Sequence, residues 1–187
     1  WIHIYVSMLS YTTLLFFAIT GITLNHPTWL GGSEQVVQDY FGELPPDIAD
    51  SLAAQEPDKL EIAEWLRDRY QLKGKVTEFE IDDFECMLVF KGPGYAADAF
   101  VDRETGTYMV TVTSSNLIAV LNDLHKGRDS GIAWKLFIID GSAILMGLFS
   151  LSGFGLIFYL KRRRVPGLWT SLVGTIALIA AWLIWVP

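Results

Sequence analysis

Three histidines, His3, His26 and His125, are the residues of this chain best suited to bind a metal or carry a proton. Each lies near the edge of a long apolar run. A neutral imidazole offers one nitrogen lone pair, so a histidine can bind a metal ion or carry a proton. The alternative is structural: His3 is an interfacial residue, His26 a turn residue, and His125 a cation at a helix C-terminus.

The elements that position these histidines are apolar. Three long runs cover residues 4–24, 134–160 and 167–186. The only charged residues inside them are Lys135 and Asp140. About 20 apolar residues cross the hydrocarbon core as a helix, and backbone in lipid must be hydrogen-bonded internally. We therefore expect three transmembrane helices, over residues 1–25, 134–160 and 167–187.

Basic residues set the expected orientation. The short loop 161–166 begins with KRRR, and positive charge in short loops favours the cytoplasmic side. We expect the N-terminus in the cytoplasm, and residues 26–133 and the C-terminus in the periplasm of a bacterial inner membrane. The first run is too long for the apolar core of a signal peptide and is interpreted as a retained anchor.

The segment 27–132 is acidic, with 20 Asp and Glu against 9 Lys and Arg. This balance argues against a nucleic-acid partner. The single cysteine, Cys86, excludes an internal disulfide, and its place in the strand-like ECMLVF predicts a buried thiol.

Periodicity predicts an α+β fold for residues 26–133. A helix is expected over 57–71, and strand patterns cover 76–82, 85–92 and two strands within 95–113. A short helix over 116–125 is expected to be capped by Ser114 or Ser115 and to end at Gly127. Residues 31–56, with their Gly-Gly and Pro-Pro pairs, are expected to form an irregular arm or lid.

Two sets of short motifs carry a resemblance. The last hairpin, VDRETGTY at 101–108, resembles the PepSY domain. His3 with Thr20-Gly21, and Leu124-His125 with Ser152-Gly153, resemble the PepSY-associated transmembrane helix family. The resemblance implies a membrane α-helical protein with an inserted PepSY-like periplasmic domain. Some larger members resemble haem b proteins that reduce ferric siderophores, whereas smaller PepSY proteins resemble modulators of a partner, including peptidase inhibitors. Larger members have more spans and more histidines than this chain.

The resemblance and the spacing together suggest a site. His125, with His26 as a possible second ligand, would bind haem b iron at the outer membrane surface. His3 lies roughly 30 Å along a helix from His26, so it would need a partner from another subunit, such as a homodimer mate. Arg128, with Lys126, could pair with haem propionates or simply face solvent or lipid headgroups.

Asp140 is a carboxylate inside a predicted span, where an ionisable group usually has a partner. His125, Lys135 or the hydroxyls of Thr20 and Thr23 could supply one. Asp140 would then orient a ligand histidine, or make a helix-packing hydrogen bond.

Two functions follow from these observations. The first is a haem b electron-transfer subunit of a membrane oxidoreductase, linked to periplasmic reduction such as ferric-siderophore reduction or iron uptake. The alternative is a non-catalytic membrane-anchored module that binds, inhibits or assembles a periplasmic or membrane partner. A third idea, a divalent-metal site on the acidic arm, lacks the pattern of a calcium loop.

Overall fold

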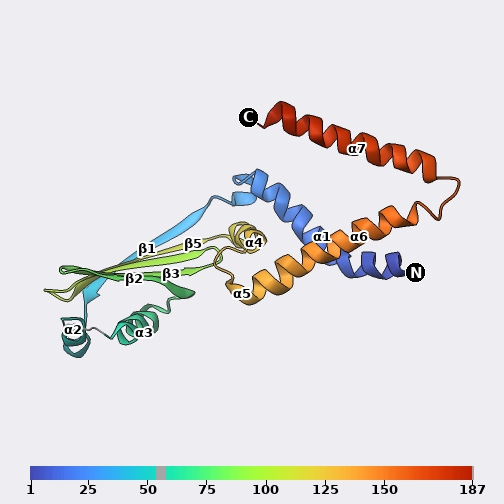
Figure 1. The fold of residues 1–187 in the computed structure, drawn as a ribbon. Coiled ribbons are helices and arrows are strands. Elements are labelled where there is room, and N and C mark those ends of the chain that lie inside the picture. Colours follow the sequence, from blue (N-terminus) through green and yellow to red (C-terminus); the bar gives the residue numbers. More distant parts are fainter. Residues whose placement is uncertain (54–57, 187) are drawn as a thin grey trace. The chain divides into compact units, whose positions relative to one another are not determined.

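The computed structural model describes residues 1–53 and 58–186, and its contacts divide the chain into two compact units (Figure 1). The helical unit comprises residues 1–15 and 140–187, and the sheet unit comprises residues 16–139. Helix α1 (Ile2–Asn25) contributes its first part to the helical unit and its last part to the sheet unit. Each unit is described below by itself.

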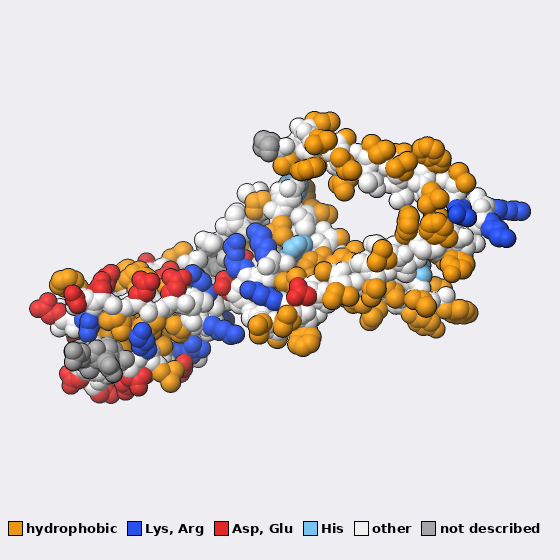
Figure 2. Space-filling model, viewed as in Figure 1, with side chains coloured by type: hydrophobic (Ala, Val, Ile, Leu, Met, Phe, Trp, Pro, Cys, Tyr) orange, Lys and Arg blue, Asp and Glu red, His pale blue; other side chains and the backbone are white. Residues whose placement is uncertain are grey.

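Within the described residues, three helices are long and apolar enough to cross a membrane: Ile2–Asn25, Gly131–Leu156 and Arg164–Trp185. Their mean hydropathies are 1.6, 1.7 and 1.9. Hydrophobic side chains gather over these helices, whereas acidic side chains gather over the sheet unit (Figure 2). Apolar surface exposed all round a helix is the property expected of a helix that faces lipid. The prediction of three membrane-capable helices is therefore confirmed.

The middle span has a composite structure. It begins with the short helix α5 (Gly131–Ala133), continues as a π-helix over Trp134–Asp140, and becomes α6 at Gly141–Leu156. The last span is α7 (Arg164–Trp185), so it begins within the basic loop expected at 161–166.

The sheet unit contains a five-stranded antiparallel sheet with the strand order β1-β5-β4-β3-β2. Its strands are β1 (Gln35–Glu43), β2 (Lys75–Ile81), β3 (Glu85–Gly92), β4 (Tyr95–Asp102) and β5 (Thr107–Ser115). The predicted turn between β4 and β5 is present: Asp102 accepts hydrogen bonds from the backbone N–H of Glu104 and Thr105, and Gly106 has φ 70°. A residue without Cβ occupies this left-handed position without strain.

Two helices cover one face of the sheet. They are α2 (Pro46–Ala53) and α3 (Lys59–Tyr70), and Asp58 caps α3 by accepting from the backbone N–H of Leu60 and Glu61. Alternate strand residues complete the core against these helices: Cys86, Leu88, Phe90, Ala97, Ala99, Val101, Val110 and Val112. The predicted burial of Cys86 is confirmed, and this burial raises the pKa of its thiol to about 11.

Two expectations for this unit were wrong. The arm expected at 31–56 contains the edge strand β1 and the helix α2. The short helix is α4 (Leu117–Lys126), and its cap is Asn116, whose side chain accepts from the backbone N–H of Ala119. Ser114 and Ser115 belong instead to β5, because pairing with β1 extends that strand to its last residue. The predicted end of α4 at Gly127 is correct.

Two histidine clamps form the candidate functional site

His125 lies at the end of α4 and packs against the last turns of α1. Its Nδ1 is 2.6 Å from Thr20 Oγ1, and its ring meets the Phe17 ring edge-on at 4.9 Å between centroids. A Cβ added to Gly21 would lie 3.9 Å from His125 Cε1, so the half-buried imidazole sits directly over this glycine. We call His125, Thr20, Phe17 and Gly21 the His125 clamp.

The hydrogen bonds of Thr20 assign the proton of this imidazole. The Thr20 hydroxyl donates to the Phe16 carbonyl over 2.6 Å, as hydroxyls in helices often do. Because a hydroxyl carries a single hydrogen, Thr20 Oγ1 must accept from His125 Nδ1–H. The other ring nitrogen, Nε2, then carries the lone pair. A ring held through Nδ1–H with Nε2 open is the form in which histidine binds a metal.

The charge state of His125 agrees with this assignment. Burial of the ring lowers its pKa below the ordinary value, and the neighbouring Lys126 ammonium adds to the effect. Both causes disfavour the imidazolium. His125 is therefore neutral at pH 7, and its Nε2 lone pair is available.

Further polar contacts fix α4 to α1 and to the segments around it. The Thr23 hydroxyl donates to Asn122 Oδ1 over 2.6 Å, and both residues are buried. Trp134 Nε1 donates to the Leu124 carbonyl over 2.9 Å. At the other end of α4, Asn116 Nδ2 donates to the carbonyl of Gly31 over 2.6 Å. The His125 clamp is thus one of several polar links.

His3 makes the same kind of cluster within the helical unit. Its Nδ1 lies 2.9 Å from Ser152 Oγ, and its ring stacks on Phe149 at 5.3 Å with an interplanar angle of 15°. A Cβ on Gly153 would lie 3.3 Å from His3 Cε1. Ser152 donates its own hydrogen to the Phe149 carbonyl over 2.9 Å, which assigns Nδ1–H to His3 and leaves its Nε2 open as well. These four residues are the His3 clamp.

Each clamp rests on the same short motif, Phe-x-x-Ser/Thr-Gly. It reads FAITG at 17–21 and FSLSG at 149–153. The hydroxyl-glycine pairs and the two histidines were singled out from the sequence, but Phe17 and Phe149 were not. A comparison of the two spans with each other reveals both phenylalanines.

His26 contacts neither clamp among the described residues. Its half-buried ring stacks on Trp29 at 3.9 Å with an interplanar angle of 7°. No hydrogen bond or ring contact joins His26 to His125 among the residues that the structure describes.

The other predicted site residues join neither clamp. Arg128 pairs with Asp123 at 3.7 Å and is largely exposed. Asp140 is exposed and makes no hydrogen bond or ion pair to any described residue, and its side chain does not cap α6. The Thr20 and Thr23 hydroxyls, which were candidates to partner Asp140, bind His125 and Asn122 instead.

The described residues contain no group of three or more His, Cys, Asp and Glu side chains that could hold a metal ion. Each clamp instead offers a single imidazole with an open Nε2, beside a glycine and an aromatic ring. Such a ring could serve as a single imidazole ligand of a metal ion or a haem iron. A haem bound here would need any further ligand from outside the clamp.

Comparison with known proteins gives one match. No curated protein and no solved structure matches this chain. The sequence model of the PepSY_TM-like family matches residues 1–187, which is the whole chain. The two histidine-centred motifs and the three apolar helices thus occur in a membrane protein of the PepSY type, and the chain belongs to the PepSY_TM-like family.

Proposed function

We propose that this protein is a haem b electron-transfer subunit linked to periplasmic reduction, such as the reduction of ferric siderophores during iron uptake. One observation carries the proposal. The Thr20 hydroxyl fixes the Nδ1–H form of a neutral His125 and leaves Nε2 as an unused lone pair. Outer partners of this kind orient the imidazoles that bind metals in proteins.

The residues of the His125 clamp have separate roles in this proposal. His125 would supply a ligand nitrogen to the haem iron, Thr20 would hold the ring in its tautomer, and Phe17 would limit its rotation through the edge contact. Gly21 keeps the space beside Cε1 free of a side chain. Bound haem would supply one-electron chemistry, and the protein would supply position and tuning of the potential.

A second axial ligand is required for a six-coordinate haem. His26 would have to leave its stack on Trp29 to provide it. An imidazole from a second copy or another subunit requires no such change. The His3 clamp presents the same open Nε2, so we extend the proposal of an axial ligand shared between chains to His3.

A visible spectrum of the full chain tests the proposal. The protein is produced with ample haem, purified in detergent, and recorded oxidised and then dithionite-reduced. We expect a sharp reduced α-band that is lost in His125→Ala. In Thr20→Val haem is retained, but the midpoint potential shifts because Nδ1–H loses its acceptor.

His26→Ala serves as the matched histidine control and is expected to keep the band. A featureless spectrum of the unsubstituted protein would overturn the haem proposal. The function to pursue would then be the non-catalytic module, in which the clamps only fasten helices.

A further inference from the structure

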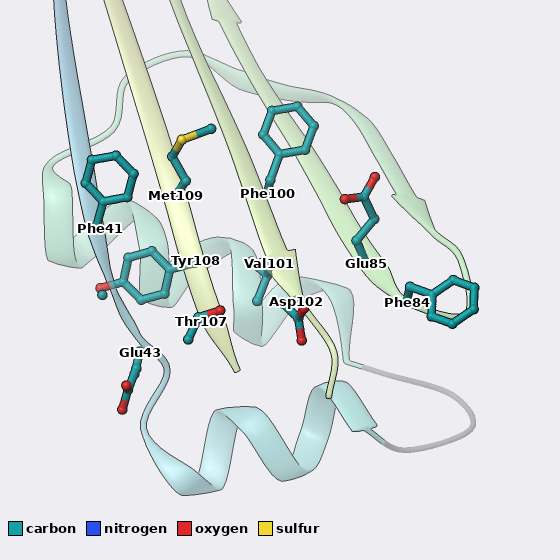
Figure 3. Close-up of a pocket in the computed structure, with 11 residues that line it drawn as sticks. Phe41, Glu43, Phe84, Glu85, Phe100, Val101, Asp102, Thr107, Tyr108 and Met109 are labelled. Carbon is teal, nitrogen blue, oxygen red and sulfur yellow. The ribbon is translucent and has the colours of Figure 1, made fainter. Parts of the chain in front are cut away.

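The face of the sheet that α2 and α3 leave uncovered carries an apolar row. Met87, Phe100, Met109 and Phe41 are register partners across β3, β4, β5 and β1. Figure 3 shows Phe100, Met109 and Phe41 side by side on three of these strands. Phe41 is 72% exposed and Met109 38% exposed. We call these four residues the apolar row.

The apolar row does not belong to the core. Strand residues alternate between the two faces, and the core takes Cys86, Leu88, Ala99 and Val110 from the opposite face. Phe84, at the turn between β2 and β3, is 79% exposed and lines the same shallow groove as Phe41, Phe100 and Met109. This groove has a volume of about 620 Å³. Contiguous exposed aromatic and methionine side chains of this kind mark interaction sites.

Carboxylates lie on both sides of the apolar row. Two residues further along the strands in one direction are Glu85, Asp102 and Glu43, and in the other direction are Asp98 and Asp39. Glu80 of β2 extends the row itself, because it pairs with Met87.

Little of this negative charge is neutralised by ion pairs, although the Lys91 ammonium interacts electrostatically with Asp98. None of these six carboxylates forms an ion pair with a described residue, although Asp102 and Asp39 accept hydrogen bonds from threonine hydroxyls. Glu78 of β2, further along the same face, pairs with Lys91 at 2.9 Å. The groove is thus an apolar strip between two acidic margins.

We propose that the apolar row docks a short amphipathic helix of a partner protein whose apolar face is edged by lysine and arginine. The spacing supports a helix lying across the strands. Neighbouring strands are about 4.8 Å apart, and successive turns of a helix are about 5.4 Å apart, so one apolar side chain per turn meets each strand. The acidic margins lie about 7 Å to either side along the strands, within reach of long basic side chains.

Charge selects this occupant over two others. A second copy of the chain would bring the same carboxylates against each other, and an anionic lipid surface would be repelled by them. A basic helix gains from both the apolar row and its margins. The inference goes beyond the haem proposal and does not depend on haem.

Binding of a synthetic peptide tests the inference. The probe is a labelled helix of about 12 residues with leucine once per turn and lysines on both edges. Its affinity is measured by fluorescence anisotropy for the full chain in phosphatidylcholine nanodiscs, with empty nanodiscs as the blank. We expect saturable binding that weakens severalfold when salt rises from about 0.05 to about 0.5 M.

Two control peptides make the result specific. A scrambled sequence of the same composition removes the apolar stripe, and a version with glutamate in place of lysine reverses its edges. We expect each to bind at least about tenfold more weakly than the probe. Equal binding of either control would overturn the inference.

Substitutions then locate the site. Phe41→Ala and Met109→Ala are expected to weaken binding about tenfold each, since they truncate the centre of the contact. Leu60→Ala is the control, because Leu60 is 70% exposed and lies on α3, which covers the other face. Unchanged circular dichroism establishes that each variant folds.

Charge variants test the margins. Glu43→Gln with Glu85→Gln is expected to weaken binding severalfold and to reduce the salt dependence, whereas Asp50→Asn with Asp68→Asn, on α2 and α3, changes neither. Equal affinities in all variants would overturn the inference. Two other results would also overturn it. One is a dimer of the chain that Phe41→Ala dissociates. The other is binding of the chain to anionic vesicles, with no peptide added, that Phe41→Ala abolishes. These outcomes would assign the row to a second copy or to lipid.

Discussion

The His125 clamp and the His3 clamp are built from the same four kinds of residue, a histidine, a phenylalanine, a hydroxyl residue and a glycine, but differ in their surroundings. In each, a histidine donates Nδ1–H to a hydroxyl that donates in turn to a helix carbonyl, and a phenylalanine and a glycine confine the ring. The His125 clamp joins a span to α4, beside the buried Thr23–Asn122 bond. The His3 clamp joins two spans, where the Ser10 hydroxyl lies 3.3 Å from the Leu145 carbonyl but only 2.7 Å from the Val6 carbonyl of its own helix.

This difference suggests separate roles for the two clamps: the His3 clamp holds two helices together, whereas the His125 clamp orients its imidazole ring. Where Asn122 and Trp134 already hold α4, the hydrogen bond of His125 is not needed to keep the elements together, so its effect is mainly to orient the ring. Between two apolar helices, a polar contact contributes a larger share of the association. The following predictions test that contrast, beginning with the largest effect.

Asn122→Ala is expected to have the largest effect. It removes the hydrogen bond from Thr23 and truncates a buried side chain, although the Thr23 hydroxyl can still donate to the Thr20 carbonyl 3.0 Å away. The lost hydrogen bond alone costs about 0.5–1.5 kcal/mol in the free energy of opening between α4 and α1, and the lost packing adds to it. Hydrogen exchange of the α4 amides measures this opening. Asn25→Ala, at the exposed end of α1, is the control. Equal exchange in both variants would show that the His125 clamp holds α4 without help.

Double-mutant cycles compare the two clamps directly. For His125→Ala with Thr20→Val we expect a coupling of about 1 kcal/mol, typical of a hydrogen bond in a folded protein. For His3→Ala with Ser152→Ala we expect about 0.6 kcal/mol, the average for polar pairs between membrane helices. Reversible unfolding in detergent gives both values. The contrast concerns what each bond holds together, so it would be contradicted by a His3→Ala variant whose spans stay packed and a His125→Ala variant whose α4 comes free.

Acid should loosen the His125 clamp. Burial, assisted by Lys126, lowers the pKa of His125 in the folded protein, so the unfolded state binds more protons. The contribution of His125 to the free energy of unfolding therefore rises with pH. It is fully present above the ordinary histidine pKa of about 6.5, and it is lost as the pH falls from there toward the lowered pKa. Hydrogen exchange of α4 between pH 7 and pH 5 measures the loss. His125→Gln should flatten this slope, and an unchanged slope would assign it to another group.

Alanine substitution of the two clamp glycines should have the smallest effect on stability, and the two substitutions should differ in direction. Gly21→Ala places Cβ at an ordinary 3.9 Å from His125, so helix propensity makes the change neutral or stabilising by up to about 1 kcal/mol. Gly153→Ala places Cβ at 3.3 Å from His3, so the ring must shift and the gain is reduced or reversed. Thermal midpoints of the two variants give the order, and a higher midpoint for Gly153→Ala would refute it.

Much of the sheet unit was predictable because β2 to β5 form a meander of neighbouring strands with clear turn signals. β1 was missed because its side chains do not alternate between core and solvent. Most of QVVQDYFGE is exposed, and its partner β5 lies far away in the sequence. The Asn116 cap was missed for a related reason, since pairing with β1 extends β5 through Ser115.

The members of the clamps were largely visible in the sequence, but their pairing was not. His125 binds the hydroxyl of the first span and His3 that of the second, and only the packing of separate helices determines such pairs. Periodicity also could not show that His26 would stack on Trp29, because a residue before proline leaves the helix in a direction set by the following turn.

The position of β1 at the edge beside β5 has a consequence for how the protein is made. Roughly 60 residues must be synthesised after β1 before β5 exists to pair with it, which takes several seconds at about 5–20 residues per second. During that time the β2–β3–β4 meander has no place for β1, because β5 is the strand with which β1 pairs in the described sheet. The nascent strand, with two valines and Phe41, therefore remains unpaired for longer than the strands of the meander, and until β5 emerges it is open to pairing with other chains.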